Sequence, residues 1–402
     1  MFIKLFRNLN LALLILNIFF IQDYLVRINV FGYPTNLQEI LIFTQIILFL
    51  FATTFEKNLS QTFNNIKKHW IGNTFVLMTA VSLLTVDITD NIYFIRHLRF
   101  LCVAVIFSFI FIETLKSEKS RIEAIKTMGI GAITFGIFSV IYNLLGYNLT
   151  HDFRLLGPLD AAVYLSFYLA PFLIFFTIQF FEHRKKSDLI FAILSTLLII
   201  ATRSIGTIIG TFLVLTIYFS KKSSLDILKS KLAKAILTIT AIIIICTTFY
   251  TKILPAFQTN YSSLNERQEI WQTSIHLFKD PLNFVWGIGF GQFQNEYATN
   301  AKEILGRNPL DYYVLQPHNI FLLFIFQYGI LGLLFLFACI VRIVKNLKKP
   351  IKNFDIRIIS NFIILYFLFH GMIDTPFFKN DLLFLLILFL EIGLGHKDKR
   401  LS

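Results

Sequence analysis

The feature that most constrains this chain is a series of long apolar blocks that recurs from one end of its 402 residues to the other. A bilayer core about 30 Å thick is crossed by roughly 17 to 25 helical residues, and closely spaced or tilted helices often show shorter apolar cores. The pattern predicts an all-α, polytopic membrane protein that forms a single integral membrane domain over residues 1–402. The twelve predicted transmembrane helices lie near residues 9–21, 39–55, 71–86, 100–115, 128–146, 161–181, 189–202, 206–219, 235–249, 319–341, 358–372 and 382–395.

Composition and charge agree with this class. Only 15% of the residues are charged and the mean hydropathy is +0.68, whereas soluble domains carry about 25% charged residues. The net charge of +13 comes from basic residues between the apolar blocks, so nucleic acid is not a predicted partner. The three cysteines lie inside apolar blocks without paired spacing, which predicts neither a disulfide framework nor a zinc site.

The loops between the blocks predict the orientation in the membrane. With the N-terminus placed inside, the inner segments hold 26 of the 37 Lys and Arg residues. Short cytoplasmic loops carry such an excess, so both termini are predicted to be cytoplasmic. The first apolar stretch lacks a small-residue cleavage site and is predicted to remain as a span.

One large external loop, at residues 250–317, is far longer than the others, and loops of this length are usually functional. Within it, Ser263–Asp280 is predicted to form an amphipathic helix. Its apolar face contains four residues within one arc: Leu264, Trp271, Ile275 and Phe278. Arg267 borders that face in the first helical turn, where free N–H groups favour an anion.

Two arginines on the outer side are candidates for binding a diphosphate. Arg203 lies between the seventh and eighth spans, where an arginine is costly unless it faces a cavity or a partner. A guanidinium group matches phosphate oxygens in a two-pronged arrangement, so Arg203 and Arg267 suit the diphosphate of a lipid-linked substrate. The alternatives are that Arg203 reaches the membrane surface from a helix end and that Arg267 binds lipid headgroups.

The loop ends with two further motifs. Gly287, Gly289 and Gly291 alternate in FVWGIGFGQF, which predicts a tight turn with close backbone approach rather than a dinucleotide site, since no parallel strand unit surrounds it. His318 and Asn319 follow at the outer end of the tenth span. His318 is either a capping or hydrogen-bonded residue or, beside the two arginines, a general base.

The order of motifs over residues 150–340 resembles the O-antigen ligase and O-antigen polymerase superfamily of multispanning bacterial membrane proteins. The motifs are R-x-x-G at Arg154, T-R-S at 202–204, R-x-x-x-W at Arg267, P-x5-G-x-G-x-G at Pro281, and H-N-x-x-L-x6-G-x-x-G-L at His318.

This resemblance implies an enzyme of the bacterial inner membrane that transfers a glycan from an undecaprenyl diphosphate carrier to an acceptor on the outer side. It implies that Arg203 and Arg267 match the arginines of the family that bind the diphosphate, and that His318 matches the catalytic histidine. Four residues are predicted as accessory: Arg154, Asn319, His370 and Asp374. Gln327 and Asp160 depart from the family pattern, so no role is carried over to them.

The predicted reaction is an inverting transfer that uses neither a metal ion nor a cofactor, since no DxD motif or carboxylate pair lies near these residues. The acceptor remains open between a lipid, another glycan chain and a protein. The alternative function is a transporter or flippase for a lipid-linked or anionic substrate, which usually shows internal repeats and helices broken near the middle of the membrane. A noncatalytic scaffold is a third possibility.

Overall fold

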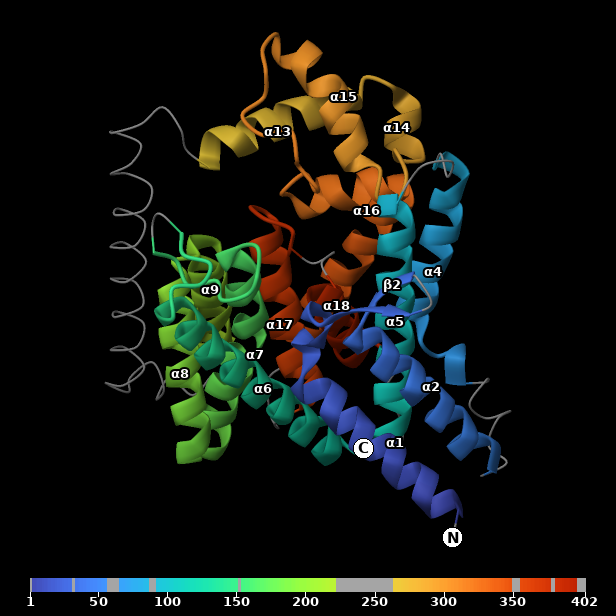
Figure 1. The fold of residues 1–402 in the computed structure, drawn as a ribbon, viewed down its shortest axis with the longest axis vertical. Helices are drawn as coiled ribbons and strands as arrows, with labels where there is room; N and C mark the ends of the chain where they lie inside the picture. The colour runs from blue at the N-terminus through green and yellow to red at the C-terminus, as the bar shows by residue number, and fades with distance from the viewer. Residues whose placement is uncertain are drawn as a thin grey trace.

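The computed structural model describes residues 2–30, 33–55, 65–86, 92–150, 153–221, 263–348, 355–376 and 380–395. They form a bundle of apolar helices covered at one end by a layer of three helices (Figure 1). The bundle contains α1 (Phe2–Phe19), α2 (Leu37–Phe55), α4 (Trp70–Ser82), α5 (Ile92–Thr114), α6 (Glu118–Leu144), α7 (Ala162–His183), α8 (Lys186–Thr202), α9 (Ile205–Lys221), α16 (Ile320–Leu347), α17 (Ile356–Gly371) and α18 (Asn380–Leu394). The covering layer contains α13 (Ser263–Leu277), α14 (Pro281–Val285) and α15 (Phe293–Leu305).

The helical class predicted from the sequence is confirmed, and a helix occupies each predicted span that the structure describes. The ninth predicted span, residues 235–249, lies outside the described residues. Five helices are long and apolar enough to cross a membrane by length and composition, namely those within 37–54, 97–114, 118–144, 162–183 and 320–347. The total of twelve spans therefore stays a prediction.

One short pair of β-strands accompanies the helices in the described residues and leaves the all-α class unchanged. After the 3-10 turn η1 (Ile21–Leu25), β1 (Arg27–Val30) pairs with β2 (Tyr33–Asn36) as antiparallel strands at the start of α2. The sequence RINVFGYPTN alternates over too few residues to be separated from a loop by periodicity alone.

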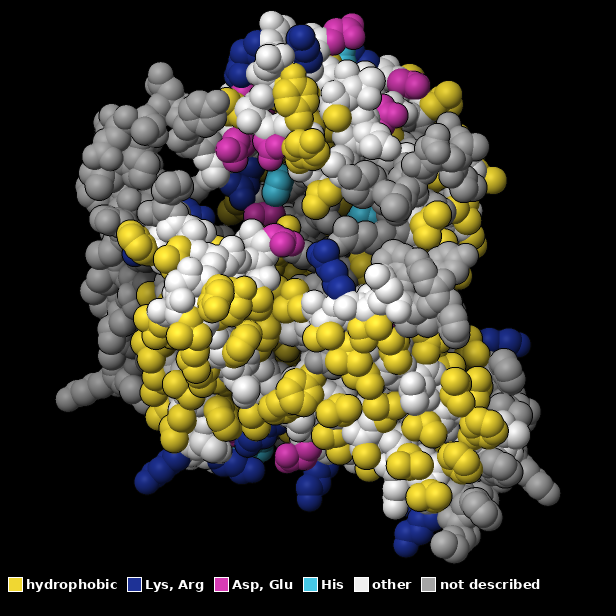
Figure 2. All heavy atoms as spheres, in the orientation of Figure 1, with side chains coloured by type: hydrophobic (Ala, Val, Ile, Leu, Met, Phe, Trp, Pro, Cys, Tyr) yellow, Lys and Arg dark blue, Asp and Glu magenta, His cyan; other side chains and the backbone are white. Residues whose placement is uncertain are grey.

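Helix α7 occupies the centre of the bundle. It packs against α6, α8, α9 and α17, and 89% of its membrane-length segment is buried. On the visible face of Figure 2, apolar side chains cover the lower half, while Lys and Arg side chains gather at the lower edge, opposite the covering layer. This surface has the apolar belt and polar edges of a membrane protein.

Helix α16 is broken at Gly329, and the glycine-rich segment that precedes it in the chain occupies the break. Gly329 has φ 59° and ψ −149°, outside any helical region. The N–H groups of Ile288 and Gly289 donate to the carbonyl oxygen of Phe326, at 2.9 and 3.2 Å, which satisfies a group that the break leaves free. Gly287 approaches the same helix so closely that a Cβ there would lie 2.6 Å from that oxygen. The predicted tight turn with close backbone approach is confirmed.

We expect Gly329→Ala to reduce the yield of folded protein severely. A Cβ at Gly329 would lie 2.1 Å from the carbonyl oxygen of Val285, and the backbone conformation there is one that only glycine adopts readily. The matched control is Gly306→Ala, because Gly306 also has a positive φ but has open space around it; this change should cost only about 1 to 2 kcal/mol. Size-exclusion chromatography of detergent extracts gives both yields, and equal yields would contradict the steric argument.

A half-buried histidine joins three helices at the end of the bundle away from the covering layer. His69, just before α4, lies between the carboxylates of Glu113 on α5 and Glu391 on α18, with nitrogen to oxygen distances of 3.5 and 3.6 Å. Burial alone would lower the pKa of His69, but hydrogen bonding and charge from Glu113 and Glu391 raise it to about 9. The imidazole is therefore protonated at neutral pH and holds the two carboxylates together.

This histidine predicts a loss of stability at alkaline pH. Because the pKa of His69 is higher in the folded protein than the ordinary 6.5, its contribution is complete below pH 6.5 and disappears as the pH rises through about 9, a loss on the order of 3 kcal/mol. Thermal unfolding in detergent between pH 6.5 and 10 should show this fall in wild type and in the exposed control His276→Gln. It should be absent from His69→Gln, and identical pH profiles for all three proteins would refute the prediction.

Candidate active site

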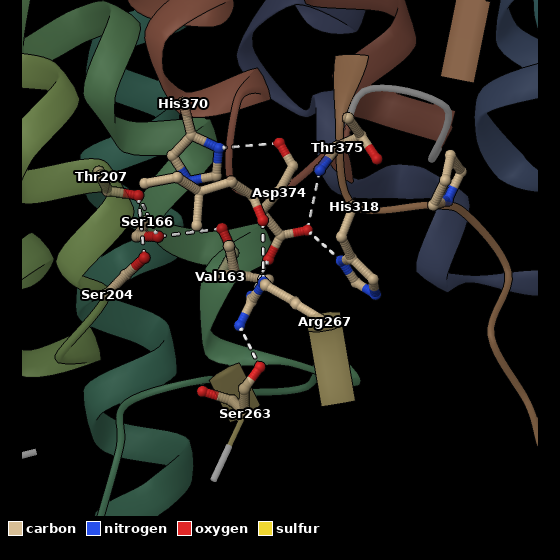
Figure 3. A network of polar contacts seen from close by, with 12 residues as sticks. Val163, Ser166, Ser204, Thr207, Ser263, Arg267, His318, His370, Asp374 and Thr375 are labelled. Atoms are coloured by element: carbon tan, nitrogen blue, oxygen red, sulfur yellow. Dashed lines mark hydrogen bonds and ion pairs between the residues drawn. The ribbon is translucent and has the colours of Figure 1, made fainter. Parts of the chain in front are cut away.

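A carboxylate between α17 and α18 lies at the centre of the polar cluster on the covered side of the bundle (Figure 3). One oxygen of Asp374 accepts from Nη2 of Arg267 at 3.0 Å. The other accepts from Nδ1 of His318 at 2.8 Å and from the backbone N–H of Thr375 at 2.8 Å. Asp374 therefore joins α13, the start of α16 and the end of α17 through a single side chain.

His318 is presented to this cluster by the turn that begins α16. Its backbone is in the left-handed region, with φ 50°. The helix is capped by the next residue, since the side chain of Asn319 accepts from the N–H groups of Phe321 and Leu322. Asn319 also donates to the carbonyl oxygen of Met372 at 3.2 Å, which fixes this turn to the end of α17. Asn319 therefore performs the capping role, and His318 is instead hydrogen-bonded to Asp374. Its role as a general base stays a prediction.

The covering layer is attached at the same point. Nε1 of Trp271 on α13 donates to the carbonyl oxygen of Pro317 at 3.0 Å. The R-x-x-x-W and P-H-N motifs, which lie 46 residues apart in the chain, are thus in direct contact. One consequence is that Arg267, one turn before Trp271, is held against the residues that follow α17.

Arg267 uses three of its five N–H groups within the protein. Nε donates to the carbonyl oxygen of Ile373 at 2.8 Å, Nη1 to that of Ser263 at 3.0 Å, and Nη2 to Asp374. Each terminal nitrogen of a guanidinium carries two hydrogens, so one N–H on each remains for an external oxygen. Arg267 can therefore both fix Asp374 and bind an anion.

The electrostatics of the cluster determine which His318 nitrogen is basic. Burial would raise the pKa of Asp374, but its interactions with His318 and then Arg267 outweigh that effect and hold the pKa well below its usual range. An ionised carboxylate only accepts hydrogen bonds, so Nδ1 of His318 carries the proton. In the neutral form of this imidazole the other nitrogen, Nε2, carries a lone pair, and Figure 3 shows the ring directing that nitrogen away from Asp374. A third of the His318 side chain is exposed, 33%.

His370 supports Asp374 from the side of the bundle core. It is buried in the last turn of α17, and its Nδ1 donates to the backbone carbonyl oxygen of Asp374 at 3.3 Å. Its Nε2 faces the start of α9, where a Cβ at Gly206 would lie 3.4 Å away. Nearby, a chain of hydroxyl contacts links α7 to α9 through Ser166, Thr207 and Ser204, at 2.8 and 3.0 Å.

Arg203 ends α8 in the left-handed conformation, with φ 54°, at the turn into α9. The segment that contains Arg154 lies against this turn, because the N–H of Leu155 donates to the carbonyl oxygen of Ala201 at 3.0 Å. The side chains of Arg154 and Arg203 are both partly exposed. The structure thus brings the segments of these two predicted residues together at one turn, and Gly206, which follows that turn, approaches His370.

The apolar face predicted for α13 needs correction. The helix ends at Leu277, and it buries Ile270, Thr273, Ser274 and Leu277 against α15 and α16 rather than exposing an apolar stripe to the membrane. Ile275, predicted on the apolar face, is 65% exposed. Trp271 and Phe278 of the predicted face do pack against this cluster, so the prediction is correct in part. The buried face is displaced from the predicted one because polar side chains are buried here along with apolar ones.

A second carboxylate, which is buried, orders the chain between α15 and α16. Glu269 on α13 pairs with Arg307, and its other oxygen accepts from the N–H of Leu310 at 2.9 Å. This pair fixes the chain that leads from α15 to His318. Nothing in the sequence singled out Glu269 or Arg307, since both read as ordinary polar residues of a loop.

The comparison with known proteins agrees with the motifs. Residues 189–337 match the family model described as O-Antigen ligase. No curated protein matches the chain. The matched region includes Arg203, Arg267 and His318, and it ends before the segment that contains His370 and Asp374. The match confirms the resemblance predicted from the sequence, and over residues 189–337 this chain is similar to the O-antigen ligase family.

Proposed function

We propose that the protein is a membrane glycosyltransferase of the O-antigen ligase or polymerase type in the bacterial inner membrane, acting on a glycan linked to undecaprenyl diphosphate. The observation that carries the proposal is the Asp374 carboxylate, which bridges Arg267 and His318 at 3.0 and 2.8 Å. It places a basic imidazole nitrogen beside a guanidinium that has two N–H groups to spare. A transfer to a hydroxyl group needs both a base and a cation at the leaving group.

In the proposed reaction, Nε2 of His318 takes the proton from an acceptor hydroxyl as its oxygen attacks the anomeric carbon of the donor. The bond from that carbon to the diphosphate oxygen breaks, and lipid diphosphate leaves with the electron pair. Arg267 and Arg203 neutralise the negative charge that grows on the leaving diphosphate. The proposed reaction therefore assigns no step to a metal ion. Attack from the face opposite the leaving group inverts the anomeric configuration. His370 and Asn319 position the residues that react.

Transport is the second candidate, and the break in α16 is the observation that favours it, since transporters often have broken helices. In this protein the carbonyl oxygen of Phe326, which the break leaves without a partner inside the helix, accepts from the N–H groups of Ile288 and Gly289. The break is thereby filled by backbone of the same chain. That arrangement supports a packing role for the break more than an ion site.

The test uses purified full-length protein in lipid vesicles with an undecaprenyl-diphosphate-linked oligosaccharide and a glycan acceptor. The proposal expects glycosylated acceptor and free undecaprenyl diphosphate in equal amounts, and unchanged turnover after EDTA treatment. Movement of intact donor between leaflets without release of diphosphate would establish transport instead. If neither glycan transfer nor transport is observed, a noncatalytic scaffold is the remaining function. Inhibition of transfer by EDTA would overturn the metal-independent mechanism.

The proposal also requires residues 263–317 to lie outside the cytoplasm, as the charge of the loops predicts. In a variant without Cys102, Cys246 and Cys339, we expect Thr299→Cys on α15 to react with a membrane-impermeant maleimide in intact spheroplasts. Lys119→Cys, at the start of α6, should react only after permeabilisation. Both positions are exposed. The opposite pattern would place the site on the cytoplasmic side and overturn the assignment.

A further inference from the structure

A cavity of about 360 Å³ opens beside His318 and Asp374, between the top of the bundle and the covering layer. Its wall comes from the starts of α5 and α7, from α13, and from residues 311–316, which the Glu269 contacts hold in place. Figure 2 shows acidic, histidine and basic side chains gathered on the visible face between the apolar lower half and the covering layer. The volume is within the range of sites that bind small molecules, roughly 300 to 1,000 Å³.

The charge of this cavity is unlike that of a diphosphate site. Four carboxylates line it, those of Asp160, Glu266, Asp311 and Asp374. Among the described lining residues the basic side chains are two histidines, His97 and His318, and neither lysine nor arginine is present. Asp374 is already paired with Arg267, but the other carboxylates disfavour a phosphate or carboxylate group here, whereas hydroxyl and amino groups would find acceptors.

The rest of the wall supplies ring faces. Phe100, Tyr164 and Tyr313 line the cavity, and Tyr313 is 81% exposed at its edge. Asp311 is held by a local turn in which its Oδ1 accepts from the N–H of Tyr313 at 2.7 Å, so the carboxylate and the ring are positioned together. Carboxylates for hydroxyl groups, together with rings for the apolar face of a pyranose, match the chemistry of a sugar.

We propose that this cavity binds the terminal sugar of the acceptor, and that it selects a sugar that carries hydroxyl or amino groups and no negative charge. The inference rests on the proposed function, because His318 takes the proton from a hydroxyl of the sugar bound there. Glu266 and Asp311 accept hydrogen bonds from the other hydroxyl groups, and Tyr313 covers one face of the ring. The donor diphosphate binds outside this cavity, at the free N–H groups of Arg267 and at Arg203.

The experiment compares three acceptor oligosaccharides that differ only in their last residue, which is glucose, glucosamine or glucuronic acid. Wild-type protein should transfer to the first two and at least tenfold less efficiently to the third. Glu266→Gln and Asp311→Asn should each raise the KM for the glucose probe about tenfold, as expected for the loss of a charged hydrogen-bond acceptor, while the KM for the donor stays the same. The Asp311→Asn variant keeps a side-chain oxygen that can accept the hydrogen bond from the N–H of Tyr313.

Charge reversal supplies a result that damage to the fold cannot imitate. Asp311→Lys should increase the efficiency with the glucuronic acid probe relative to the glucose probe. Glu303→Gln is the matched control, since Glu303 is exposed on α15 away from the cavity wall and should leave every constant unchanged. Detergent yield and unfolding temperature are measured for each variant.

The two proposals fail in different ways. Wild-type protein that releases no undecaprenyl diphosphate from the donor under any condition would contradict the proposed glycosyltransferase. Normal donor turnover with equal use of all three probes, or with an unchanged acceptor KM in Glu266→Gln and Asp311→Asn, would overturn only the acceptor cavity.

Discussion

His318→Ala should lower the rate of glycan transfer by about 10²- to 10⁴-fold while donor affinity changes little, because the proposed base acts on the acceptor hydroxyl and not on the diphosphate. The Nδ1 atom of His318 is tied to Asp374 at 2.8 Å, and only Nε2 faces outward. The measurements are single-turnover transfer and donor binding with purified protein.

The control for a structural effect is His318→Gln, which retains an amide that can donate to Asp374. It should restore yield and unfolding temperature if alanine lowers them, yet transfer should remain as slow as in the alanine variant. Undiminished transfer in either variant, with normal abundance and donor binding, would remove His318 from the mechanism. A parallel loss of donor affinity would mean that His318 binds phosphate.

The sequence predicted the helical membrane class because hydrophobic length is a local property of each segment. It also predicted that Arg267 and His318 belong to one active site, since both occur in motifs. It gave Asp374 only an accessory place, and the reason is physical. Asp374 lies 56 residues after His318. Local periodicity cannot show that the start of α16 and the end of α17 lie close together in the fold.

Burial explains most of what the sequence missed. Glu269 and Glu391 lie 5% exposed within helices, paired with Arg307 and His69 from distant segments. A buried carboxylate is stable only when a partner reaches it, and the partner is fixed by the fold rather than by the neighbouring residues. The same reasoning applies to the acidic cavity, whose wall combines residues 97–100, 160–164, 266–270 and 311–316.

Arg267→Lys should reduce transfer by about 10²-fold or more although the positive charge is kept, which is typical of losing one oriented donor to a developing charge. Lysine has one nitrogen, and it cannot reach Ile373, Ser263 and Asp374 together as the guanidinium does. Lys302→Arg, at an exposed position of α15, is the reciprocal control and should be neutral.

Asp374→Asn separates the two roles assigned to Arg267. If Arg267 acts only by fixing Asp374, the double variant Arg267→Lys with Asp374→Asn should be no slower than the slower single variant, as for residues that work as one unit. If the two remaining N–H groups also bind the diphosphate, Arg267→Lys should raise the donor KM about tenfold or more, and Asp374→Asn should not. Arg203→Lys should then raise the same constant, since Arg203 is assigned to the same anion. A donor KM unaffected by both arginine changes would move the diphosphate elsewhere and leave Arg267 as a residue that positions Asp374 and, through it, His318.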